Sequence, residues 1–130
     1  MPAGPMQFEV DSERAKRQNV LQGLRVGSAE YASIGDNKGA GNLDIFRKHF
    51  EELLEIVDVV RDRSVELPEA IALFDFGGKV VLRFGTLVRV GRQHSSDSHV
   101  KTAKAHLMQY FPEVVDYMKT YFGGTVNGSS

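Results

Sequence analysis

The sequence contains no cysteine, and this absence removes several classes of chemistry. Without thiols there is no disulfide framework, no thiolate zinc site and no cysteine nucleophile. Small secreted domains often depend on disulfides, so the composition favours a reducing compartment. We therefore expect a cytoplasmic protein.

Long apolar runs are also missing. No segment approaches the roughly 20 apolar residues that a membrane-spanning helix needs. Residues 1–6 hold two prolines, a glycine and no basic residue, which does not match a secretory signal peptide. The sequence therefore predicts no membrane partner.

The composition is that of an ordinary folded domain. The chain has 130 residues, of which 42% are apolar and 25% charged. A chain of this length buries about two thirds of the surface that its unfolded form exposes, so it folds without a metal or a disulfide. We expect one domain and no cofactor.

The clearest pattern is a two-residue alternation over residues 79–91. Such alternation predicts a strand with one buried and one exposed face. Gly77 and Gly78 separate this segment from the mostly apolar residues 71–76, which indicates a hairpin turn. The alternative for residues 67–74 is a helix with Pro68 at its first position. The apolar or small side chains at even positions are Val80, Leu82, Phe84, Thr86, Val88 and Val90.

Helical spacing dominates elsewhere. A helix is expected over residues 43–63, another over residues 97–122 with a break or kink at Pro112, and a weaker one from about residue 12 to residue 24. We therefore predict an α+β fold, in which a small antiparallel sheet, built on hairpin 71–91 with its long second strand, packs against helices 43–63 and 97–122. The strongest helix has apolar residues spaced three and four apart, at Leu43, Phe46, Phe50, Leu53, Val57 and Val60.

The expected domain organisation is simple. Residues 1–10 form an N-terminal tail or short strand, residues 11–122 a single α+β domain, and residues 123–130 a flexible C-terminal tail. Residues 35–41 are rich in glycine and predict a loop.

The long strand suggests assembly. A strand with a shorter partner leaves backbone donors and acceptors unpaired, and another chain can pair with them. We expect a non-enzymatic binding or assembly module that self-associates, most simply as a dimer, or binds another protein. The contact surface would be the 79–91 strand edge or the seam of the 43–60 helix. The candidate interface residues are Val81, Leu87, Val88, Phe46, Phe50, Leu53 and Val57.

An alternative follows from the charge distribution. Acids outnumber bases over residues 44–75, whereas residues 76–96 carry four bases and no acid. Those bases either meet the acidic segment of the same or another protomer, or they bind single-stranded nucleic acid without sequence preference. The candidate nucleic-acid residues are Lys79, Arg83, Arg89, Arg92, Phe74 and Phe76.

No pattern indicates catalysis. His99 and His106 are seven residues apart, on the order of 10 Å along a helix, which is too far for two ligands of one zinc ion. The sequence therefore favours a binding protein over an enzyme, and it names no catalytic, metal or cofactor residue.

Overall fold

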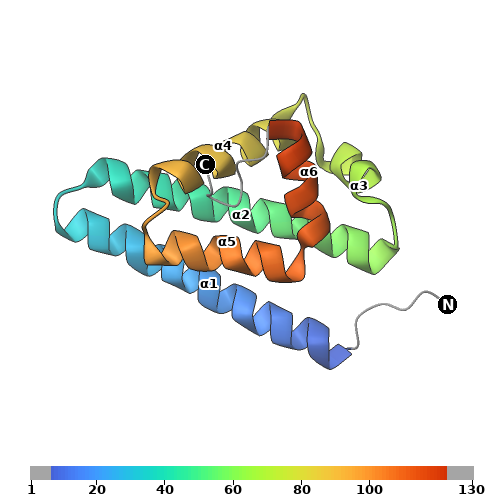
Figure 1. The fold of residues 1–130 in the computed structure, drawn as a ribbon, viewed down its shortest axis with the longest axis horizontal. Helices are drawn as coiled ribbons and strands as arrows, with labels where there is room; N and C mark the ends of the chain where they lie inside the picture. Colours follow the sequence, from blue (N-terminus) through green and yellow to red (C-terminus); the bar gives the residue numbers. More distant parts are fainter. Residues whose placement is uncertain (1–6, 123–130) are drawn as a thin grey trace.

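The computed structural model describes residues 7–122, and these residues form helices and no strand. Figure 1 shows their arrangement. The helices are α1 (Gln7–Ser33), α2 (Asn37–Arg63), α3 (Leu67–Phe74), α4 (Lys79–Gln93), α5 (Ser98–Tyr110) and α6 (Pro112–Phe122).

The two longest helices, α1 and α2, form an antiparallel hairpin (Figure 1). Gly35 lies in the connection with a φ of 81°, a left-handed conformation that glycine adopts without steric cost. Asp36 then caps α2, because its side chain accepts a hydrogen bond from the backbone N–H of Gly39 at 2.8 Å. The hairpin is the base on which the other helices pack.

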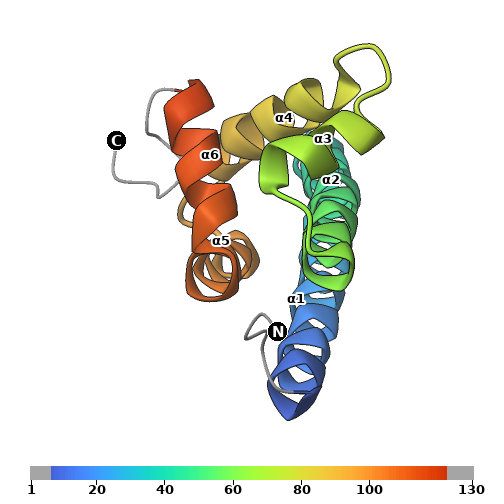
Figure 2. The ribbon, with the colours of Figure 1, turned by 90° about the vertical axis from the view of Figure 1, so that its right-hand side faces the viewer.

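The shorter helices cover one side of this base. α5 lies along α1, α3 and α4 contact α2, and α6 contacts α4 and α5. Figure 2 shows α5 and α6 beside the hairpin, with α4 extending between α2 and α6. α5 approaches α1 closely at Gly27, where an added Cβ would lie only 2.8 Å from the His99 ring and 2.7 Å from the Leu43 side chain.

The core joins all six helices around α2. Its largest fully buried side chains include Phe46, Phe50 and Phe84, each exposed by 1% or less. Burial of such side chains contributes about 1.5–3 kcal/mol each relative to exposure, so this core carries most of the stability of the fold.

The predicted α+β fold is wrong, because the hairpin segment is helical: residues 67–74 lie in α3 and residues 79–91 in α4. The alternation also fits a helix, since Val80, Phe84, Leu87 and Val88 recur at helical spacing and face the core. Two leucines distinguish the helix from the predicted strand. Leu82 is 69% exposed although the strand required it to be buried, and Leu87 is 3% exposed on the face that the strand left open.

Other predicted bounds also change. The 43–63 helix exists but begins at Asn37, so most of the predicted 35–41 loop is helix. The weak N-terminal helix extends to Ser33, and residues 7–10, expected in a tail or short strand, already belong to it. The break at Pro112 is confirmed, because Pro112 begins α6. Residues 1–6 and the predicted tail at 123–130 lie outside the described residues.

Candidate functional site

A buried cluster of charged side chains joins α1, α2 and α5. Glu13 is only 2% exposed, and its carboxylate accepts hydrogen bonds from Arg17 Nε at 3.3 Å and from Arg61 Nη1 at 3.1 Å. Arg17 donates two more to Asp58, at 2.9 and 3.0 Å. Two carboxylates and two guanidinium groups thus compensate one another, which allows charges to stay ionised inside a protein.

The position of Arg17 in this cluster is determined by the helix hairpin. Arg17 follows Glu13 by one turn of α1, and the antiparallel α2 brings Asp58 to the same level. Burial alone lowers the pKa of Arg17, but Asp58 and Glu13 outweigh it and raise the pKa above its ordinary value. Arg17 therefore remains a cation and ties α1 to α2.

His106 of α5 closes the cluster from the other side. It is 5% exposed, and its Nε2 lies 3.5 Å from Glu13 Oε1, within ion-pair distance but without hydrogen-bond geometry. The rings of Phe50, Tyr110 and Phe111 surround it at centroid distances of 4.9–6.2 Å. Burial lowers the pKa of His106, Glu13 opposes this, and Arg17 and Lys16 lower it further. His106 is consequently neutral at pH 7.

This neutral histidine predicts a loss of stability in mild acid. In the unfolded chain His106 titrates near its ordinary pKa of about 6.5, whereas the folded protein resists its protonation. The unfolded state therefore binds the extra proton first, and stability falls as the pH drops below about 6.5. His49, whose pKa is also lowered by burial, acts in the same direction.

Urea unfolding at about pH 7.5 and about pH 5.5 measures this effect. The wild-type chain should lose stability between the two values, and His106→Gln should lose less, because it has no proton to bind at that site. An equal pH dependence in both proteins would show that His106 contributes nothing.

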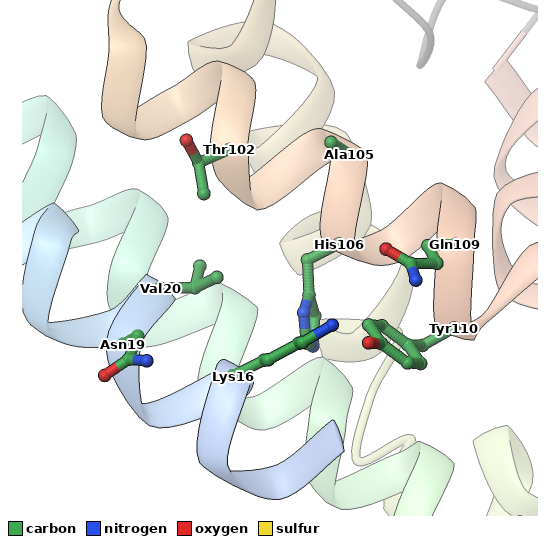
Figure 3. A pocket seen from close by; sticks show the side chains of 8 residues that line it. All are labelled: Lys16, Asn19, Val20, Thr102, Ala105, His106, Gln109 and Tyr110. Carbon is green, nitrogen blue, oxygen red and sulfur yellow. The ribbon is translucent and has the colours of Figure 1, made fainter. Parts of the chain in front are cut away.

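A cleft of about 280 Å³ opens beside the cluster, between α1 and α5. Figure 3 shows the His106 ring extending from α5 towards α1, between Val20 and Tyr110. The ammonium group of Lys16 lies 5.6 Å from the centre of the Tyr110 ring, a cation–π distance. The residues that line the cleft are Lys16, Asn19, Val20, Thr102, Ala105, His106, Gln109 and Tyr110.

A second polar cluster holds the turn between α4 and α5 against α1. The Tyr31 hydroxyl donates a hydrogen bond to Asp97 Oδ2 at 3.0 Å and lies 3.5 Å from His94 Nδ1. Burial, followed by the hydrogen bond to Asp97, raises the pKa of Tyr31, so the phenol stays protonated and is a poor nucleophile. Asp97 also caps α5 by accepting from the N–H groups of His99 and Val100. This cluster is explained as a structural joint.

No group of three or more histidine, aspartate or glutamate side chains within residues 7–122 is arranged to hold a metal ion. The same stretch also contains no helix with the length and apolar character needed to cross a membrane.

Three exposed apolar side chains lie close together in the sequence, within residues 73–82, where α3 is connected to α4. Leu73 on α3 is 50% exposed, Phe76 in the connection 72%, and Leu82 on α4 69%. Gly78, the residue that caps the N-terminus of α4, has a φ of 76° and a left-handed conformation, so the chain turns sharply there. We call these three side chains the α3–α4 corner.

A small pocket of about 100 Å³ lies beside this corner, between α2 and the α3–α4 pair. Glu55 on its rim is exposed, while Glu52 is held by Arg83 at 2.6 Å. Its apolar walls are Leu53, Ile56, Phe74, Val80 and Phe84.

The predicted interface residues lie mostly inside the protomer. Val81 is half-buried, whereas the other six, at positions 46, 50, 53, 57, 87 and 88, are each exposed by 9% or less. The 43–60 seam is therefore part of the protein's own core. The 79–91 segment has no strand edge, because its backbone groups bond within α4.

The predicted nucleic-acid residues are divided. Arg83 pairs with Glu52 of the same chain, and Phe74 packs on the core. Lys79, Arg89, Arg92 and Phe76 remain exposed.

Sequence reasoning missed the buried cluster. A signal was present, since Glu13 and Arg17 have the spacing of an ion pair on one helix face and that face also holds Val10, Val20 and Leu24. Charged residues within an apolar stripe point to a buried, paired site.

Comparison with known proteins gives no relative: no protein-family model, no curated protein and no solved structure matches this chain.

Proposed function

We propose that the protein is a non-enzymatic, self-associating module, and that two copies pair through the α3–α4 corner. The observation that carries this proposal is the exposure of Leu73, Phe76 and Leu82 within one short stretch. Large apolar side chains clustered on a surface are typical of interaction sites.

The adjacent pocket supplies a complementary surface. In a pair related by a two-fold axis, both chains use the same surface. Phe76 of each chain would therefore face the pocket of the other chain. The pocket of about 100 Å³ is smaller than the cavity of about 150 Å³ that accepts benzene, so only the tip of the Phe76 ring would enter it, beside the charged rim of Glu52, Glu55 and Arg83. Phe74 and Val80, which line the pocket, lie on either side of Phe76 in the sequence. The inserted ring and the pocket that receives its counterpart are therefore neighbours on each chain.

Charge supports the same pairing. Lys79 follows Phe76 closely, is exposed, and has no acid partner among the described residues. Glu55 is exposed on the pocket rim. Insertion of Phe76 into the second copy thus carries Lys79 towards the Glu55 of that copy, a complementary contact at the edge of the interface.

Sedimentation equilibrium of the wild type and of Phe76→Ser tests this proposal. We expect a wild-type dimer whose dissociation constant rises at least about 30-fold in the variant, because loss of a central aromatic anchor typically costs about 2 kcal/mol or more. Ile34→Ser is the matched control: Ile34 is 77% exposed but lies in the α1–α2 connection, and its replacement should leave the dimer intact. A wild-type monomer, or equal effects of both substitutions, would remove the proposal.

A charge exchange gives an independent check. Lys79→Glu and Glu55→Lys should each weaken the dimer, and the double variant should recover most of the loss. If the double variant is weaker than both single variants, these two residues do not meet.

A second candidate is sequence-tolerant binding of single-stranded nucleic acid on the exposed side of α4. The observation that favours it is that Lys79, Arg89 and Arg92 are exposed on a helix without an acid. Fluorescence anisotropy with an oligothymidylate should then show a log–log salt slope of about −2 for three phosphate contacts, reduced by about 0.7 in Arg89→Gln. No binding at low salt would exclude this candidate.

A further inference from the structure

We infer that the cleft between α1 and α5 binds a small organic carboxylic acid with an apolar, ring-like body. This site is separate from the α3–α4 corner and does not depend on self-association. The inference rests on one cation at the cleft that has no acid partner among the described residues, apolar walls behind it, and a buried histidine at its base.

The cation is Lys16. It is exposed and has no acid within ion-pair distance among the described residues. Of the described side chains that line the cleft, Lys16 alone carries a charge, because His106 is neutral. No carboxylate lines the cleft, and the nearby Glu13 is buried and already occupied by Arg17 and Arg61. An anionic ligand group therefore meets an available ammonium group and no repelling acid.

The walls fit an apolar body. Val20 of α1 and Ala105 of α5 provide aliphatic surface, and the Tyr110 ring provides an aromatic face (Figure 3). The volume of about 280 Å³ is just below the usual range for ligand pockets, about 300–1,000 Å³. The occupant is thus a small acid with a single ring or a short chain.

The base of the cleft is polar. His106 is 5% exposed, and its Nε2 faces Glu13 Oε1 at 3.5 Å, so its imidazole ring forms the inner wall of the cleft. Asn19, Thr102 and Gln109 add uncharged donors and acceptors around the opening.

The test is an NMR titration of the full chain with phenylacetate and with its neutral isostere phenylacetamide. We expect phenylacetate to bind with a dissociation constant on the order of 1 mM, with the largest shift changes at Lys16, Thr102, His106 and Tyr110. Phenylacetamide should bind at least about tenfold more weakly, because it lacks the charge that Lys16 recognises.

Two variants locate the site. Lys16→Met keeps the aliphatic stem and should weaken phenylacetate about tenfold, while Lys48→Met on exposed α2 surface should change nothing. Ala105→Trp, at an exposed position that tolerates a larger side chain, should fill the cleft and abolish binding with the helical spectrum retained. Equal binding of the two probes, shifts outside the cleft, or unchanged affinity in Lys16→Met would each overturn the inference.

Discussion

Replacing Glu13 with leucine should destabilise the protein by about 3–5 kcal/mol, because the change removes one partner from a buried charge network. Arg61 then loses its hydrogen bond to that carboxylate, and Arg17 keeps only Asp58. The free energy of unfolding from urea denaturation, followed by circular dichroism, measures the loss.

The control lies one position along the same helix. Arg14 pairs with Asp62 at 3.9 Å, but both side chains are well exposed, so Arg14→Met should cost less than about 1 kcal/mol. If Glu13→Leu is as mild as Arg14→Met, the buried network does not hold α1 to α2.

A double variant separates the charge effect from simple packing. Glu13→Leu combined with Arg17→Met replaces both buried charges with apolar side chains, and the pair should cost at least about 1 kcal/mol less than the sum of the single variants. Strict additivity would mean that the two side chains act independently.

Replacing Phe50 with alanine in the otherwise wild-type chain should lower the free energy of unfolding by about 3–5 kcal/mol. Phe50 is fully buried and packs against Phe46 and His106. The effect is one of folding, so the unfolding midpoint of the variant should fall at every protein concentration. Phe76→Ala, which trims an exposed ring, should change the monomer's stability by less than about 0.5 kcal/mol.

This comparison also distinguishes core from interface. If Phe50 served mainly as a contact between protomers, its replacement would change the association constant and leave the stability of the monomer nearly unchanged. That result would contradict the placement of the 43–60 seam inside the protein.

The sequence predicted the helices whose apolar residues keep a spacing of three and four. Residues 43–63 fall in α2 for this reason, and Pro112 separates α5 from α6 because proline has no N–H to donate within a helix. Over residues 79–91 the sequence could not decide, since a run of valines and leucines satisfies both periods. Packing against the rest of the protein selects the helix, in which Leu87 is buried and Leu82 is exposed.

Glycines misled the prediction of a loop at residues 35–41, and glycine elsewhere in the α1–α2 hairpin also lies inside a helix. Gly27 lies within α1, where its lack of a side chain permits the close approach of His99, and Gly39 lies in the first turns of α2. Glycines that suggest a helix break in the sequence therefore mark places in this fold where another side chain approaches a helix closely. The predicted loop at 35–41 failed on this point.

The buried cluster required tertiary information. Glu13 and Arg17 are visible as a helical pair in the sequence, but their partners Asp58, Arg61 and His106 lie on two other helices. No local pattern relates these positions, because they meet only when α1 and α2 fold back on each other and α5 packs along α1.

The central claim, that two copies of this chain associate through the α3–α4 corner, is tested most directly by native mass spectrometry of the wild-type protein and Phe76→Ser, both purified without nuclease. We predict that the wild type carries the mass of two 14.4 kDa chains and no additional mass, and that the variant appears as one chain. A wild-type monomer, or a monomer with heterogeneous nucleotide mass, would contradict the claim, and the second of these results would favour the basic surface of α4.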